Sequence, residues 1–281
     1  MTIVLKRGRN FLILMQLLRN YILLLRLKIH KSIHGINHPI VHYYAVCWNE
    51  ERILPFMFQH YDKFVDHYTI YDNYSTDQCE AIIRSHHNAD IVKFRTDGFN
   101  DNEHARIKNS CWKRSRGKAD YVVVCDTDEF LYHEDIFAFL QDASRQRYSF
   151  FRPEGWEMYS ATFPTFEKGI PLTTQVKVGV PSPNYGKSIL FDPYRIVEIN
   201  YEPGAHFCHP LGLVRTLNHS GLKVLHYKNL GLDYMMSRIN SYRKRMSDIN
   251  KEEQYAFHYY YDDQQIAATF HENLNNAVPA I

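Results

Sequence analysis

Apolar segments alternate with amphipathic segments along the chain from residue 40 onward. Strands are expected at 40–48, 67–72, 89–95 and 121–125, and helices at 55–64, 75–86 and 100–116. Ser75 and Gln78 have the spacing of a capping box for the second of these helices. Strands and helices that alternate with short links predict right-handed crossovers and a mainly parallel sheet. The hydrophobic pattern therefore predicts an α/β fold in which helices flank a central sheet.

The regular alternation weakens after residue 135. A helix is expected to about residue 144 and a strand at 148–152, followed by Gly- and Pro-rich sequence with short β segments to about 228. A last helix is expected at 232–249, before a polar, aromatic tail at 251–281. We therefore expect one domain at 39–250, with a regular half at 39–130 and an irregular half at 131–250.

The first 38 residues form a basic, strongly apolar segment. Seven basic residues and no acidic residue precede Glu50, although the whole chain has a net charge of only +2. Residues 11–29 are apolar but interrupted by Arg19 and Arg26, so no run approaches the ~20 residues that span a bilayer. The pattern predicts a basic amphipathic helix that lies either on an anionic membrane surface or on the protein's own body. It does not indicate a nucleic-acid-binding surface.

The five cysteines are scattered along the chain. They include no CxxC pair, which argues against a disulfide framework or a structural zinc site. Cys47 and Cys125 fall inside expected strands and are predicted to be small core residues. The cysteine pattern favours a reducing compartment and hence a cytoplasmic protein, peripheral at the inner face of the membrane if the N-terminal helix binds lipid.

Four polar residues, Asp126-Thr127-Asp128-Glu129, directly follow the apolar run 121–125. An unbroken Val-rich run predicts a buried strand, and open α/β sheets bind ligands at the carboxyl ends of their strands. Asp126 and Asp128 are expected to point to the same side, about 6.5 Å apart. Carboxylates so close repel each other unless a positive group lies between them. The pair therefore predicts a site in which both carboxylates bind one divalent cation, or in which one binds the cation and the other binds a hydroxyl of the ligand. The alternative is a strand that simply ends in a polar turn.

Polar clusters also follow two earlier strands. Asn49-Glu50 follows the strand at 40–48, and residues 72–77 follow the strand at 67–72. The carboxyl ends of parallel strands lie at one edge of a sheet. We therefore expect these two clusters to lie beside Asp126 and Asp128 on a shared rim.

Four motifs carry a resemblance to a known family: CWNEERILPFMFQHY, IYDNYSTD, DYVVVCDTDEF and VLHYK. With them, residues 40–240 resemble the family 2-type glycosyltransferases of the GT-A fold, particularly the bacterial subgroup with a WNE or KNE opening and a D-x-D-E-F signature. The resemblance implies transfer of a sugar, with inversion, from a nucleoside diphosphate sugar to a glycan or lipid-linked acceptor. It further implies a role in cell-surface polysaccharide or lipopolysaccharide synthesis, with nucleotide bound by 39–130 and acceptor by 131–250.

The resemblance also implies a metal site. Asp128 would ligate the ion directly, Asp126 would bind metal or ribose, and His226 of VLHYK would be the third ligand. His206 and His209 are the alternative histidines. A ligand set of carboxylates and one imidazole suits Mn²⁺ or Mg²⁺ better than Zn²⁺.

Other residues are expected to bind the donor. By the same resemblance, Asp72, Asn49 and Glu50 would hold base and ribose. Lys187, beside a glycine at 186, would meet a phosphate as a point charge, or else be a solvated loop lysine.

The catalytic base is sought among the acidic residues after the strand at 148–152. An inverting enzyme needs a carboxylate to accept the proton of the acceptor hydroxyl. Glu154 and Glu157 lie beside Trp156, whose ring could stack on a sugar. The acidic pair usual in the family is not reproduced cleanly, and Glu157 is the preferred candidate.

Two other functions use the same residues. Haloacid dehalogenase-type phosphatases also place D-x-D after an apolar strand, but that strand normally comes first, and Phe130 stands where they carry Thr or Val. A non-catalytic relative would only bind nucleotide or glycan. Phosphomonoester hydrolysis would indicate the first, and nucleotide binding without turnover the second.

Overall fold

The computed structural model describes residues 2–281, without the side chains of residues 2–9, 219, 220 and 258. Lys6, Arg7 and Arg9 of the predicted basic segment therefore have side chains outside the described part. The α-helices are α1 Thr2–His34, α2 Leu54–Tyr61, α3 Cys79–Ser85, α4 Asp101–Ser110, α5 Ile136–Arg145, α6 Leu172–Gln175, α7 Leu232–Lys244, α8 Asp248–Glu252 and α9 Asp263–Asn276. The 3₁₀ helices are η1 Cys111–Ser115, η2 Pro183–Tyr185, η3 Pro203–Ala205 and η4 Phe257–Tyr260.

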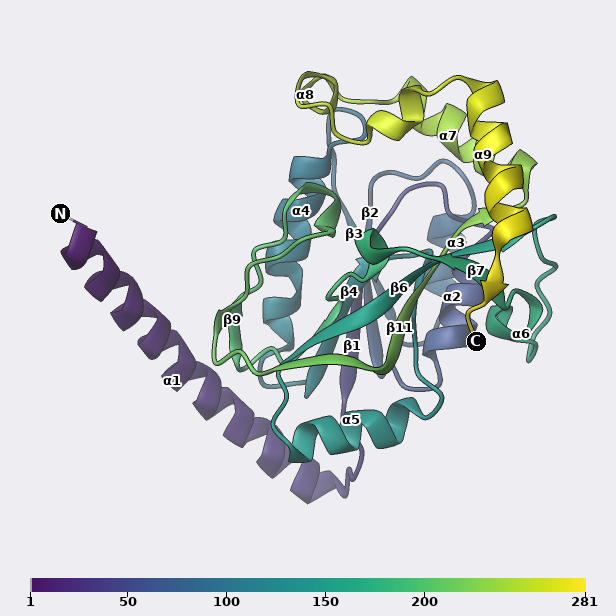
Figure 1. Ribbon diagram of the computed structural model, residues 1–281. Coiled ribbons are helices and arrows are strands. Elements are labelled where there is room, and N and C mark those ends of the chain that lie inside the picture. The colour runs from purple at the N-terminus through teal and green to yellow at the C-terminus, as the bar shows by residue number, and fades with distance from the viewer. Residues whose placement is uncertain (1) are drawn as a thin grey trace.

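The strands build one large sheet and a small hairpin-like sheet (Figure 1). They are β1 Val41–Cys47, β2 His67–Asp72, β3 Ala89–Lys93, β4 Tyr121–Asp126, β5 Glu129–Tyr132, β6 Phe150–Ser160, β7 Val178–Pro181, β8 Leu190–Phe191, β9 Ile196–Glu198, β10 Leu211–Gly212, β11 Thr216–Leu230 and β12 Val278–Pro279. The large sheet runs β12-β7-β6-β8-β4-β1-β2-β3, with β11 beside β6 and β5, and β9 pairs with β10.

The sheet changes character at β4. From β3 through β2 and β1 to β4 every pair is parallel, whereas β8 joins β4 antiparallel. Beyond β8 the pairs are antiparallel except β6 with β11. The predicted α/β class is confirmed, and the parallel half is the half that carries the predicted strand–helix repeats.

Alternate residues of β1 pack into two different cores. Tyr43 and Cys47 face the core shared with α2, α3 and α5, while Tyr44 and Val46 face the core shared with α4 and η1. Figure 1 shows α4 on one side of the sheet and α2 and α3 on the other. Side chains of a strand alternate between faces, so a continuous apolar run must be covered on both sides. Cys47 and Cys125 are buried core residues, as predicted.

Several element boundaries differ from the prediction. The helix expected from Ser75 begins at Cys79, because Ser75 bonds to Asp72 and offers no cap to the helix. The helix expected at 100–116 continues as 3₁₀ from Cys111, and the helix expected at 232–249 is divided between α7 and α8.

The C-terminal half is also more ordered than predicted. The Gly- and Pro-rich region contains the 15-residue strand β11, and the expected tail contains α9 and β12. Strand β12 pairs with β7 at the edge of the large sheet.

Helix α1 is much longer than the other helices and extends away from the body toward its N-terminus (Figure 1). Its C-terminal half contacts the body, where Leu27 is fully buried beside Ile40, Ala119 and Tyr194. Within residues 2–281, no helix combines the length and apolar character needed to cross a membrane.

Candidate active site

The carboxyl ends of β1, β2 and β4 form one rim, as the sequence predicts. The parallel register pairs Cys47 with Asp72 and Val46 with Asp126. Adjacent strands lie about 4.8 Å apart, so Asp72 and Asp126 lie about 10 Å apart across β1. Three polar loops therefore meet at this end of the sheet.

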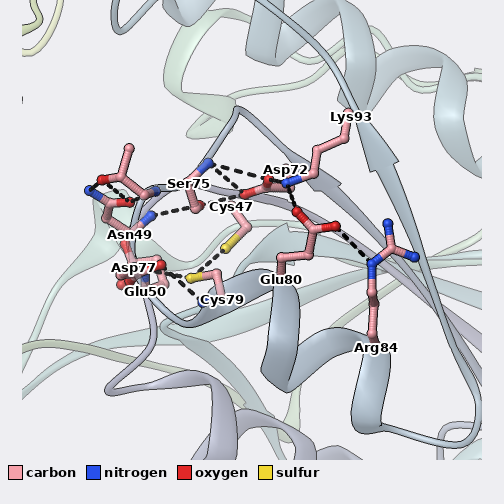
Figure 2. Close-up of polar contacts among 11 residues, drawn as sticks. Cys47, Asn49, Glu50, Asp72, Ser75, Asp77, Cys79, Glu80, Arg84 and Lys93 are labelled. Atoms are coloured by element: carbon pink, nitrogen blue, oxygen red, sulfur yellow. Dashed lines mark hydrogen bonds and ion pairs between the residues drawn. The ribbon is translucent and has the colours of Figure 1, made fainter.

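The loops after β1 and β2 hold each other in place (Figure 2). The Ser75 hydroxyl accepts a hydrogen bond from Asn49 N at 2.9 Å, and Asn49 Oδ1 accepts one from Thr76 N at 2.8 Å. Asp72 is fully buried, accepts a hydrogen bond from Ser75 N at 3.2 Å and pairs with Lys93. The side chains of Asp72 and Asn49 thus order the rim, and their predicted contact with base and ribose stays a prediction.

A cavity of about 280 Å³ opens beside this rim. Its walls come from the ends of β1 and β4, helices α4 and α7, and the short helices η3 and η4. The residues that line the cavity include Trp48, Glu50, Phe99, His104, Lys108, Asp126, Asp128, Tyr185, Lys187, His206, His226, Lys228, Arg238, Tyr242 and Tyr259.

Asp126 lies between two lysines. Lys108 Nζ donates to its Oδ1 at 2.7 Å, and Lys187 Nζ lies 3.5 Å from its Oδ2. Lys187 also forms an ion pair with the buried Glu129. Burial alone would raise the pKa of Asp126, but Lys108 and Lys187 outweigh it and hold that pKa well below its usual range. Burial opposes the charge of Lys187 too, yet Glu129 and Asp126 raise the pKa of its amine.

Asp128 is paired from the other side of the cavity. Its Oδ2 accepts a hydrogen bond from Arg238 Nη1 at 2.8 Å and lies 3.5 Å from His226 Nε2. Burial would raise the pKa of Asp128, but Arg238 and His226 hold it well below its usual range. Arg238 also pairs with Glu50, whose pKa burial nevertheless raises to about 7. Asp128 is therefore anionic at neutral pH, while Glu50 titrates near neutrality.

The predicted metal ligands Asp126, Asp128 and His226 are neighbours, and both carboxylates already have protein partners. Carboxylate and imidazole are suitable donors for Mn²⁺ or Mg²⁺. However, no group of three His, Cys, Asp or Glu side chains is gathered closely enough to hold a metal within the described residues. Asp126 is engaged by Lys108, and Asp128 by Arg238 and His226. Protein cations therefore occupy the positions where the sequence places a metal.

Four side chains lining the cavity have buried polar atoms without a hydrogen-bond partner among the described residues. They are Glu50 Oε2, His104 Nε2, His226 Nδ1 and Arg238 Nε. Burial lowers the pKa of His104 to about 4, so its ring is neutral. Buried polar groups are nearly always hydrogen-bonded, so these atoms can bond to water or to a polar ligand in the cavity.

Aromatic rings form the cavity wall near η4. Tyr242 and Tyr259 stack with ring centroids 5.4 Å apart, and the Phe99 ring lies edge-on to Tyr242 at 4.9 Å. The Arg245 guanidinium lies 3.8 Å from the centre of the Trp48 ring. A wall of this kind suits a flat ring or a sugar face.

The remaining predicted residues lie at different distances from the cavity. His206 lines it, whereas His209 is exposed and pairs with Glu202. Glu154 and Glu157 lie on β6 outside the lining, with Glu157 directly opposite His226 in the β6–β11 register. The catalytic role of Glu157 or Glu154 stays a prediction.

Sequence reasoning missed Lys108, His104 and Arg238. Lys108 and His104 lie four residues apart on α4, so one helix face brings both to the rim. That spacing was available in the sequence, but it does not show that Lys108 pairs with Asp126, which lies 18 residues further along the chain. Arg238 reaches Asp128 across 110 residues, and no local pattern marks it.

Comparisons with known proteins give a distant likeness in structure. No family model and no curated protein matches the chain. TarS of S. aureus is 11% identical with a TM-score of 0.40; the match covers 67% of this chain and 36% of TarS. GalNAc-T7, crystallised with UDP, GalNAc and Mn²⁺, is 12% identical with a TM-score of 0.43; that match covers 73% of this chain and 48% of GalNAc-T7. The chain thus spans a third to a half of these structures.

Proposed function

We propose that the chain is a glycosyltransferase that moves a sugar from a nucleoside diphosphate sugar to a glycan or lipid-linked acceptor. One observation carries the proposal: Asp126 and Asp128 line a cavity at the mouth of parallel strands, together with the buried Lys108 and Lys187 and the part-buried Arg238. Open α/β sheets bind nucleotides at this place, and Lys and Arg are the side chains that bind phosphate. The cavity therefore has the position and the chemistry for a diphosphate.

The cations have a direct role in the proposed reaction. Breaking the bond between the sugar carbon and the diphosphate leaves extra negative charge on the phosphate oxygens. Lys108, Lys187 and Arg238 are N–H donors that line this cavity, and donors placed in advance stabilise such charge effectively. Their ion pairs with Asp126, Glu129 and Asp128 fix the positions of these cations before the charge develops.

The nucleoside is proposed to lie against the aromatic wall. Its base would stack beside Tyr242 and Phe99, and the unpartnered His104 Nε2 would meet a polar atom of the base or ribose. Glu50 Oε2 offers an acceptor for a ribose hydroxyl. Both residues gain a hydrogen bond that they lack in the protein alone.

Glu157 is the proposed base, and the reaction is proposed to proceed with inversion. Burial lowers the pKa of the cavity-lining Lys228 to about 8, and the nearby charge of Glu157 opposes this shift. Glu157 also lies directly opposite the cavity-lining His226 in the β6–β11 register, whereas Glu154 lies opposite Lys223, and this position favours Glu157 over Glu154. Its carboxylate would accept the proton of the attacking hydroxyl.

A divalent ion, Mn²⁺ or Mg²⁺, stays a prediction at Asp126, Asp128 and His226. When bound it would add a Lewis acid at the phosphates. Entry at Asp128 Oδ2 would require Arg238 to release that oxygen. With a lipid-linked acceptor of cell-surface polysaccharide synthesis, the enzyme would work in the cytoplasm at the inner face of the membrane.

Thermal shift measurements with UDP-, GDP-, CMP- and dTDP-sugars, each with Mn²⁺ or with EDTA, test the proposal. One donor is expected to raise the melting temperature, because a ligand at 100 times its Kd adds about 2.7 kcal/mol of stability. Asp128→Asn should abolish the shift, while Asp142→Asn, an exposed aspartate on α5, should retain it.

The same samples separate the alternatives. Hydrolysis of p-nitrophenyl phosphate without any donor shift would replace the transferase by a phosphatase. A donor shift without sugar transfer to any glycan acceptor would indicate a binding protein. If the donor raises the melting temperature equally in Mn²⁺ and in EDTA, donor binding does not need a metal, and Lys108, Lys187 and Arg238 alone would bind the diphosphate.

A further inference from the structure

Helix α1 is apolar on two opposite sides. One side faces the body: Asn20 donates to the Tyr194 carbonyl at 2.9 Å, Leu27 is fully buried, and Lys31 pairs with Asp120 at 2.7 Å. Residues 20, 27 and 31 fall on one face of a helix that turns 100° per residue. This face is the attachment of α1 to the protein.

The opposite side carries an exposed apolar stripe. Its side chains are 41–73% exposed and recur every three or four residues. The stripe consists of Phe11, Met15, Leu18, Ile22, Leu25, Ile29 and Ile33. At 100° per residue these positions fall within about 80° and point directly away from the body-facing side. A stripe of this length is larger than the scattered apolar residues normal on a soluble surface.

Only positive charges border the apolar stripe. Arg19 and Arg26 lie along one edge and Lys28 along the other, all exposed. No acidic residue precedes Glu50. An apolar strip between basic edges is typical of helices that lie in the interface of a membrane.

A second copy of the helix is the competing occupant. The stripe has the 3–4 spacing of a coiled-coil seam, with Leu18 and Leu25 alternating with Ile22 and Ile29. The flanking positions would then bring Arg19, Arg26 and Lys28 of one helix beside the same basic residues of the other. Like charges there oppose pairing, whereas an anionic surface is complementary to them.

The attachment of α1 leaves room for a flat partner. The contacts with the body come from the opposite side, and the helix projects beyond the body toward its N-terminus (Figure 1). A planar surface can therefore touch the apolar stripe along its length. We propose that the apolar stripe lies in the interface of an anionic lipid bilayer and that α1 fixes the orientation of the protein on it.

Co-sedimentation with vesicles tests this proposal on the full chain. Wild type should bind vesicles of phosphatidylcholine with phosphatidylserine, bind phosphatidylcholine vesicles more weakly, and lose affinity as salt is raised. Ile22→Gln with Leu25→Gln should abolish binding. Replacing Arg19 and Arg26 by glutamine should weaken it about fivefold per residue, the equivalent of about 1 kcal/mol each.

The control is Ile170→Gln, because Ile170 is 42% exposed, close to the 41% of Leu25, but lies outside α1. It should bind as wild type does, and circular dichroism should show every variant folded, since the replaced side chains are exposed. Sedimentation velocity without vesicles should give the same mass for wild type and the Ile22/Leu25 variant. Failure of wild type to bind, or equal binding by the Ile22/Leu25 variant, overturns the proposal. A dimer that this variant dissociates assigns the apolar stripe to a second copy instead.

Discussion

Replacing Lys187 by methionine tests whether Lys187 neutralises the buried carboxylates of the site. The Lys187 side chain is 4% exposed and forms ion pairs with Glu129, which is 1% exposed, and with Asp126. Methionine keeps the length of the apolar stem and removes the charge. Glu129 would then be a buried carboxylate without its cation.

The expected loss in the free energy of unfolding depends on which carboxylates keep a cationic partner after Lys187→Met. Breaking a buried ion pair by removing one side costs about 3–5 kcal/mol. Asp126 retains Lys108 at 2.7 Å, so the penalty falls mainly on Glu129, and we expect a loss of about 3 kcal/mol. Adding Glu129→Gln removes the stranded charge and keeps an oxygen that can accept from Asp126 N, as Glu129 Oε2 does at 3.1 Å. The double variant should therefore lie within about 1 kcal/mol of wild type.

Urea unfolding of wild type, both single variants and the double variant at pH 7.5, followed by circular dichroism, gives the four free energies. We expect a coupling energy of at least about 2 kcal/mol. The control is Lys113→Met. Lys113 Nζ lies 2.5 Å from Glu198 Oε2, the same distance as from Lys187 Nζ to Glu129 Oε1, but the Lys113 and Glu198 side chains are about one-third exposed or more. An exposed pair of this kind should contribute no more than about 1 kcal/mol.

Two results would contradict the assigned roles of Lys187 in different ways. A coupling energy below about 0.5 kcal/mol would mean that Lys187 does not neutralise Glu129. The stable double variant should also fail to bind the donor found by thermal shift, since the phosphate ligand is gone. If it binds like wild type, Lys187 is a structural residue, and the donor site must be sought around Lys108 and Arg238.

Three further predictions concern stability. Burial raises the pKa of Glu50 from 4.5 in the unfolded chain to about 7 in the folded protein. Ionised Glu50 therefore destabilises the folded state more and more as the pH rises from 4.5 to 7. Relative to wild type, Glu50→Gln should add about 2 kcal/mol more to the free energy of unfolding at pH 8 than at pH 5. Gly155→Ala would place a Cβ 2.1 Å from Gly186 N, and should cost about 3 kcal/mol in urea unfolding and weaken donor binding. Leu27→Ala should cost about 2–5 kcal/mol because Leu27 is fully buried, whereas Leu25→Ala should change the free energy of unfolding by less than about 0.5 kcal/mol.

The parallel half of the fold and the position of the rim could be predicted from the sequence. Strands β1 and β4 are mostly apolar runs, which are stable only when both faces are covered, and the polar residues that follow them must then lie at the carboxyl ends. Asp126, Asp128 and Glu50 were located by this local argument, and all three line the cavity. The antiparallel half was not predictable in this way, because β11 and β12 are paired through contacts remote in the sequence.

Only the tertiary structure decided what neutralises the acidic cluster. The sequence predicts that two close carboxylates need a positive partner, and a metal ion was expected. The folded chain brings Lys108 of α4, Lys187 of the loop between η2 and β8, and Arg238 of α7 to them. Charge pairing acts through space over a few ångströms, so separation along the chain does not reveal it.

The exposed side of α1 was likewise decided by packing. The sequence shows that α1 is apolar on most sides, but only its packing on the body shows which side remains exposed, because the helix period alone does not say which face is covered.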